Sequence, residues 1–236
     1  MGFSASWRLF VQALKTSYDH IGKVMLFNLI WFAMGFAPIL VMTYLPVNSD
    51  IFFAACLITT FITLGGATAA IHYVMSRIIS GEDTSVRDFW NGFKQFFARG
   101  GVILFLAILG FTILVFNIWF SGNYPNTVFL ILAGFWVWGI IYWYAMLQFV
   151  FPFLTQQNVG VFLSLKRAAL ITLDNPLASG ILLVLGLVVI VLSAVLAAPI
   201  LIFTASFLAL LQNYFYNELM LKYDTIETEE ELPEVE

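Results

Sequence analysis

Five long stretches without a charged residue dominate this sequence, and they limit what it can fold into. They are residues 24–45, 51–76, 102–120, 127–154 and 177–216. A helix needs about 20 predominantly apolar residues to cross a membrane. The last stretch is about twice that length, so it must fold back on itself. Its best corner is Ala197-Ala198-Pro199, because proline cannot donate a backbone hydrogen bond and disfavours helix in the residue before it. The pattern therefore predicts six transmembrane helices.

Composition agrees with a membrane class. Of the 236 residues, 61% are hydrophobic and only 10% are charged, whereas a soluble domain carries about 25% charged residues. The one cysteine, Cys56, excludes an intrachain disulfide and a cysteine-based metal cluster. The sequence predicts an all-α, polytopic integral membrane protein, with the lipid bilayer as its first partner.

Basic residues predict the orientation. Cytoplasmic segments of membrane proteins are enriched in lysine and arginine, and the ten basic residues fall in the head, around 77–100, in 155–176 and at Lys222. The connections after the first and third spans have none. Both termini should therefore be cytoplasmic. Residues 1–223 should form one transmembrane domain with a formal charge of +3, and residues 224–236, with seven acidic and no basic side chains, a disordered acidic tail.

Amphipathic segments precede the spans. Ser85 and Asp88 form a capping-box pattern, and an aromatic face then alternates with a basic one up to Arg99. This predicts an interfacial helix lying on the inner leaflet. Residues 6–15 align with 85–94, and a third amphipathic segment, 161–173, lies about 77 residues further on. The hypothesis is a threefold repeat (1–79, 80–158 and 159–223) of an interfacial helix plus a transmembrane hairpin. The alternative is chance likeness between basic amphipathic helices.

Polar residues inside the spans are the candidates for a site, because they are costly in lipid and usually face protein or a water-filled cavity. An inward-opening polar cavity would use the following residues: His72, Gln148, Gln212, Asn213 and Glu218. His72 would be a proton acceptor or ligand-binding group, with Glu218 its possible partner. The alternative, which we favour, is a neutral His72 hydrogen-bonded to Gln148, Gln212 or Asn213 for structural reasons.

Small residues and aromatic residues have simpler interpretations. Two small-x-x-x-small pairs, Gly65 with Ala69 and Gly66 with Ala70, predict a surface where a neighbouring helix approaches closely. Five aromatic residues between Trp136 and Tyr144 could form a stacking platform, but they surround their helix, which favours packing against protein or lipid.

Two stretches resemble the YesL-type family, a group of bacterial multi-span proteins of unknown function. The first is GGATAAIHYVMSRIISGEDTSVRDFWNGFKQFF (65–97), and the second joins YWYAMLQFVFPFL (142–154) to LKRAALITLDNP (165–176). The chain departs from the family pattern at Gly65-Gly66, where a proline is expected, and in its acidic tail. The resemblance implies a multi-pass protein of the bacterial inner membrane, often encoded beside carbohydrate uptake systems, with no established catalytic residues.

Motifs for catalysis are absent: there is no H-E-x-x-H, P-loop or G-x-S-x-G. We therefore expect no enzyme activity, cofactor, metal site or nucleic-acid partner. The first hypothesis is a non-catalytic accessory or scaffold subunit of a larger membrane assembly, such as a carbohydrate transporter. The second is a small-molecule carrier or channel, and the third, least favoured, is an enzyme acting on a lipid or isoprenoid. The sequence does not predict the oligomeric state.

Overall fold

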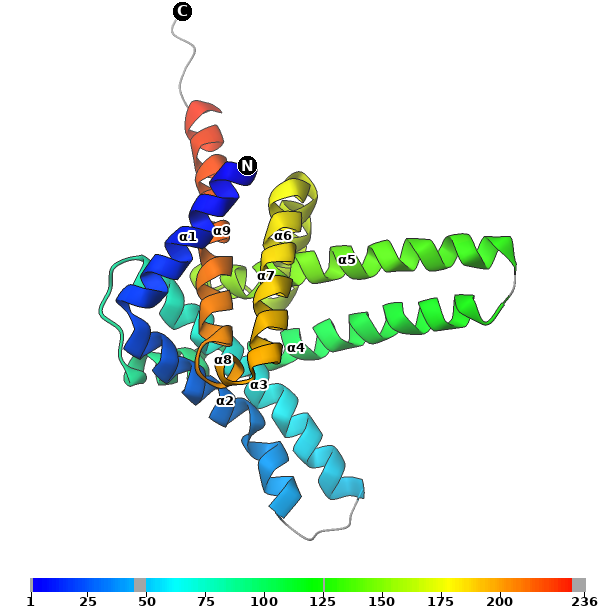
Figure 1. Cartoon of the computed structure of the whole chain (residues 1–236), viewed down its shortest axis with the longest axis horizontal. Helices are drawn as coiled ribbons and strands as arrows, with labels where there is room; N and C mark the ends of the chain where they lie inside the picture. The colour runs from blue at the N-terminus through cyan, green and yellow to red at the C-terminus, as the bar shows by residue number, and fades with distance from the viewer. Residues whose placement is uncertain (1, 45–49, 125, 231–236) are drawn as a thin grey trace, which may run out of the picture.

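The computed structural model describes residues 2–44, 50–124 and 126–230, and side chains within these ranges as far as residue 223. All secondary structure in this part of the chain is helical (Figure 1). In chain order the helices are α1 (Phe3–Asp19), α2 (Ile21–Tyr44), α3 (Asp50–Ile79), α4 (Val86–Gly122), α5 (Thr127–Gln156), α6 (Val161–Asp174), α7 (Pro176–Leu196), α8 (Ala198–Ile202) and α9 (Thr204–Glu230).

Five of these helices are long and apolar enough to cross a membrane: α2, α3, α4, α5 and α7. They correspond to five of the six predicted spans. The sixth predicted span forms the first part of α9, whose composition does not meet the same criterion. The prediction of a helical membrane protein is confirmed, whereas a count of six spans stays a prediction.

The hairpins splay apart instead of packing as a parallel bundle. In Figure 1, the free end of α2–α3 points downward and the free end of α4–α5 points to the right. The α7–α9 pair runs upward from its α8 corner, beside α1. Large apolar side chains are exposed along the outer halves of the first two hairpins, as expected for surfaces that face lipid.

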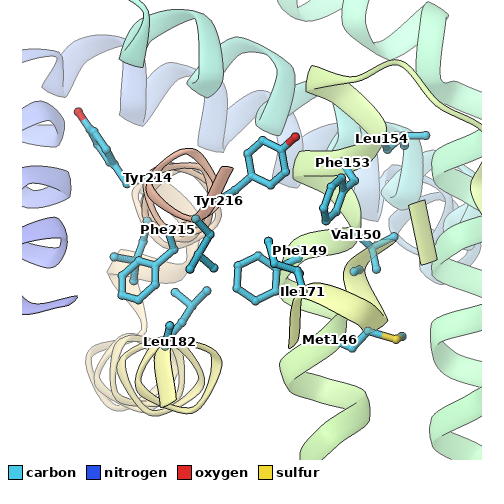
Figure 2. Packing of buried hydrophobic residues seen from close by; sticks show 14 of the residues in the cluster. Met146, Phe149, Val150, Phe153, Leu154, Ile171, Leu182, Tyr214, Phe215 and Tyr216 are labelled. Carbon is cyan, nitrogen blue, oxygen red and sulfur yellow. The ribbon is translucent and has the colours of Figure 1, made fainter. Parts of the chain in front are cut away.

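The core consists of two clusters that share α9. One joins α5, α6, α7 and α9 with α1, and Figure 2 shows Phe149 and Phe153 of α5 facing Phe215 and Tyr216 of α9. The other joins α2, α3 and the start of α4 to Leu210 of α9. Because α9 is surrounded by protein on most sides, it is the central helix of the fold.

A single buried asparagine organises the corner between α7 and α9. Asn28 of α2 is fully buried and donates from Nδ2 to the carbonyls of Ile200 (3.0 Å) and Leu201 (2.7 Å). Its Oδ1 accepts from the backbone amides of Ala205 (2.8 Å) and Ser206 (3.1 Å). These backbone groups belong to the end of α8 and the first turn of α9, which have no partners within their own helices.

The position of this corner differs from the one that six full, parallel spans would give it. The chain does turn at the predicted residues, with Ala197 at φ 57° and Pro199 in the first turn of α8. Six parallel spans would place this corner level with the free end of α2, at Tyr44. The structure instead packs it on Asn28, 16 residues earlier and therefore about 24 Å back along α2.

The amphipathic segments are helical, but only two of them are separate helices. The predicted segments 6–15 and 161–173 lie in α1 and α6. The middle one is continuous with its span, because α4 runs unbroken for 37 residues, about 55 Å. Its apolar face is also not wholly available to lipid: Phe89, Phe93 and Phe96 are buried in the protein core. The threefold repeat stays a prediction.

The capping box at the start of α4 is present. The amide and hydroxyl of Ser85 donate to Asp88 Oδ2 at 2.9 and 2.8 Å. Of the predicted acidic tail, residues 224–230 continue α9 as helix, and residues 231–236 lie outside the described part of the chain.

Trp90 tests where the surface of α4 meets the membrane. Its side chain remains 45% exposed, and the ammonium group of Lys94 lies 5.3 Å from its ring centre. We expect this aromatic–basic pair to sit at the interface, with the ring at acyl-chain depth. The fluorescence of Trp90 is the part of the signal that the Trp90→Phe variant lacks. Brominated lipids should quench this component. Quenching of that component by a water-soluble quencher alone would place this part of α4 outside the bilayer.

Candidate functional site

A close crossing of α3 and α4 sets the position of His72. A Cβ added to Gly65 would lie 2.6 Å from the carbonyl carbon of Gly100, and one added to Gly100 would lie 2.8 Å from the carbonyl carbon of Gly65. Gly66 lies against Phe93 and Phe97. Glycine at both crossing positions lets the two backbones touch. Ala69 and Ala70, on the next turn of α3, are fully buried.

A cavity of about 430 Å³ opens one to two turns from this crossing, where α2, α3, α4, α5, α7, α8 and α9 meet. Three predicted site residues, His72, Gln148 and Gln212, line it. The remaining walls are mainly apolar, and the volume is within the range of about 300–1,000 Å³ typical of small-molecule sites. The full lining is Trp31, Thr68, Ile71, His72, Leu104, Tyr144, Leu147, Gln148, Phe151, Ile190, Ile200, Thr204, Ala205, Leu208, Ala209 and Gln212.

His72 is held by a hydrogen-bond network behind the cavity wall. Its ring stacks on Phe151 at a centroid distance of 5.5 Å, and its Nδ1 is 3.3 Å from Nδ2 of Asn213. Asn213 Nδ2 also donates to the carbonyls of Ala209 (2.8 Å) and His72 (3.3 Å), while its Oδ1 accepts from Gln156 (2.8 Å). This network makes Nδ1 an acceptor, so a neutral ring carries its proton on Nε2.

Three other polar side chains on the cavity wall make no hydrogen bond with the described residues. They are Tyr144, Gln148 and Gln212. Gln148 stands out because it is only 5% exposed and its Nε2 has no solvent contact. Buried amides in proteins nearly always have a partner, since leaving one unpaired costs about 1–3 kcal/mol. These three side chains are therefore the ones that can hydrogen-bond to a molecule in the cavity.

Glu218 is not part of this cluster. Its carboxylate accepts a hydrogen bond from Arg8 Nη2 at 3.1 Å, which joins α9 to α1. The predicted pairing of Glu218 with His72 is therefore not what the structure has. Two residues that the pattern did not single out, Gln156 and Trp31, do contribute. Gln156 lies in the run Thr155-Gln156-Gln157, whose polarity indicated a helix end and gave no sign of an inward contact.

The aromatic residues of α5 have separate roles. Trp143 donates to the carbonyl of Ala107 at 3.1 Å, and Tyr142 donates to the carbonyl of Ala169 at 3.1 Å. Trp138 is 71% exposed, on the outer part of the hairpin. Of the five aromatic residues between Trp136 and Tyr144, only Tyr144 lines the cavity, so these five side chains do not form one stacking platform.

Charged groups gather at the turn that leads from α3 to α4, and none of them lines the cavity. Arg77 binds Glu82 and Asp88, each at 2.7 Å, and Lys23 of α2 binds Asp83. The hydrogen bond and charge of Lys23 hold the pKa of the exposed Asp83 carboxyl below its usual value. No described group of three or more histidine, cysteine, aspartate or glutamate residues could hold a metal ion.

Residues 24–118 match the model of a family described as "Protein of unknown function, DUF624". The matched region runs from α2 to most of α4 and includes His72, both crossing glycine pairs and the 65–97 stretch that resembles YesL-type proteins. No curated protein and no solved structure matches the chain. The chain is thus similar to a family of unknown function, and its apolar helices mark it as a membrane protein.

His72 can be tested with a pair of substitutions. We expect His72→Gln to leave stability nearly unchanged, because an amide can still accept from Asn213. His72→Leu should cost about 1 kcal/mol, since Asn213 keeps its bonds to Ala209 and Gln156. The measurement is the unfolding midpoint in detergent. Equal losses for both variants would mean that the imidazole itself, and not a hydrogen bond, is required.

Proposed function

We propose that this chain is a non-catalytic accessory or scaffold subunit of a larger membrane assembly, such as a carbohydrate transporter. The observation that supports this most is the divergence of the first two hairpins, which leaves an apolar groove of about 750 Å³ along α3 and α4. A chain that packed all of its spans against one another would leave no such surface. In this proposal, a transmembrane helix of a partner subunit fills the groove.

The groove has the length and chemistry that such a helix requires. On α4 it extends from Phe97 to Thr112, about 22 Å, which is enough for four turns. Thr112 is its one polar lining residue among the described ones, and Gly101 lets a partner backbone come close. Association of helices in lipid depends on such close packing between small and apolar residues.

The carrier alternative has less support. A carrier needs polar groups along a path and helices interrupted near the midplane. Here the polar side chains gather in one cavity with mainly apolar walls. The enzyme alternative would need an activated nucleophile or a metal cluster beside the cavity, and His72 is the one histidine, cysteine, aspartate or glutamate among the described residues that line it.

The test of the accessory role is purification in mild detergent from the organism of origin at native expression level. We expect a stoichiometric membrane partner with the wild-type chain. Leu109→Trp, which fills the groove, should remove that partner, whereas Leu130→Trp on the exposed face of α5 should not. Recovery of the chain with lipid alone would contradict the accessory role.

We further propose that both termini are cytoplasmic, because the basic residues lie away from the free ends of the first two hairpins. A hairpin returns to the side from which it started, so this holds whether or not α7–α9 crosses completely. In a chain whose Cys56 is replaced, an impermeant thiol reagent added outside should label Gly122→Cys and miss Arg87→Cys.

The same reagent tests the depth of the third hairpin. Because the α8 corner packs at the level of Asn28, Ala198→Cys should also be missed from outside. Labelling of Ala198→Cys would support six full spans, and labelling of Arg87→Cys would reverse the proposed orientation.

A further inference from the structure

We propose that the cavity between α3, α5 and α9 binds an uncharged amphiphile, a molecule with a hydroxyl or carbonyl group attached to a hydrocarbon portion. The proposal is independent of the accessory role. It rests on a polar side chain, Gln148, that is buried on the cavity wall without a hydrogen-bond partner. It also rests on the polar groups that share that wall.

The polar groups define the head of the ligand. Gln148 and Gln212 each offer an amide, Tyr144 offers a hydroxyl, and the Nε2 proton of a neutral His72 is not used by the Asn213 network. Together they can both donate and accept, which suits a hydroxyl or a carbonyl. A pure hydrocarbon would leave the Gln148 amide without a hydrogen-bond partner.

The absence of charge excludes ionic ligands. No arginine, lysine, aspartate or glutamate contributes to the lining given by the described residues. A phosphate, carboxylate or ammonium group placed there would be a buried charge without a counter-ion, which is far more costly than a buried neutral group.

The apolar walls define the rest of the ligand. Leu104, Leu147 and Ile190 come from three different helices and face the same space as the amides. A fully polar solute would lose its hydration against these surfaces without replacement. An amphiphile satisfies both parts of the wall, and because these helices lie in the membrane, it can enter by way of the bilayer.

The test uses two photoactivatable probes with the full chain in lipid nanodiscs. One is dodecan-1-ol carrying a diazirine, and the other is dodecane carrying the same diazirine but no hydroxyl group. We expect the alcohol to label peptides that contain residues 144–151 and 204–212, and to do so about threefold to tenfold more strongly than the hydrocarbon, which corresponds to one or two neutral hydrogen bonds. A probe with a carboxylate in place of the hydroxyl should label these peptides less than the alcohol.

Substitutions in the cavity wall test whether the preference for the alcohol probe over the hydrocarbon probe arises there. Gln148→Leu should abolish the preference for the alcohol without lowering the unfolding midpoint of the ligand-free protein, because it removes an unpaired buried amide. Gln212→Leu should reduce the preference. Asn117→Leu is the matched control, since Asn117 is half-buried on α4, lies outside the cavity lining and donates to Ile113 of its own helix. Equal labelling by the two probes, labelling outside the cavity peptides, or an unchanged preference in Gln148→Leu would each overturn the proposal.

Discussion

Gly65→Ala should push α3 and α4 apart and lower the free energy of unfolding by about 1–3 kcal/mol. The added methyl group would lie 2.6 Å from the carbonyl carbon of Gly100 and 2.8 Å from the Cα of Gly101. Both are backbone atoms of a helix, so no side chain can rotate out of the way. The clash can be relieved only by moving one helix away from the other, which loosens the wall that carries His72.

The reciprocal substitution and a matched control make this prediction specific. Gly100→Ala should have a similar cost, because its Cβ would meet the backbone of Gly65. Gly134→Ala, two turns into α5, has nothing within 4 Å of its added Cβ. It should leave stability unchanged or raise it by about 0.5–1 kcal/mol through helix propensity. The measurement is a denaturation titration in mixed micelles. A Gly65→Ala loss no larger than that of Gly134→Ala would show that the crossing is loose.

The periodicity of small residues was enough to predict that a helix approaches Gly65 and Gly66, but not which helix. The partner residues, Gly100 and Gly101, stand between the amphipathic part of α4 and its apolar part. In the sequence they resemble the end of an interfacial helix. Their role depends on how two helices cross in space, which is information that the spacing within one helix does not contain.

The central helix α9 shows why composition predicts some spans better than others. A helix surrounded by lipid must be apolar around nearly its whole circumference. α9 is enclosed by protein, so it can carry Asn213 and Gln212 on one face and Tyr214 and Tyr216 on others. Its turn at Pro199 was predictable from backbone chemistry. The depth of that turn was not, because it is set by a side chain on α2 that is more than 170 positions away.

The candidate site was partly predictable for the same reason. Polar residues in apolar runs are few, so His72, Gln148, Gln212 and Asn213 could be selected from the sequence alone. The structure brings these four residues to one region and leaves Glu218 outside it. The prediction grouped these residues by their depth along their helices. Depth alone does not distinguish a residue that faces the cavity from one, such as Glu218, that faces α1.

Asn28→Leu should be the most damaging single substitution in the chain, with a loss of about 3–5 kcal/mol in the free energy of unfolding. The leucine has a similar branched shape but leaves the carbonyls of Ile200 and Leu201 and the amides of Ala205 and Ser206 without partners. Each unsatisfied buried group costs about 1–3 kcal/mol. The total is smaller than the sum, because the corner can shift and admit water.

One further variant separates the donor of Asn28 from its acceptor, and a second serves as a control. Asn28→Asp keeps the acceptor for the first-turn amides of α9 but turns a carboxylate oxygen toward two carbonyls, so it should also destabilise the fold. Asn117→Leu is the control, because Asn117 is half-buried and its side chain donates to Ile113 of the same helix. It should change stability little.

Hydrogen exchange provides a readout at the corner itself. In the wild-type protein the amides of Ala205 and Ser206 are bound to Asn28 and should be protected, and in Asn28→Leu their exchange should accelerate more than that of amides later in α9. If these amides exchanged at the same rate in both proteins, Asn28 would not hold the corner. The third hairpin would then be free to extend beside α2, as six full spans require.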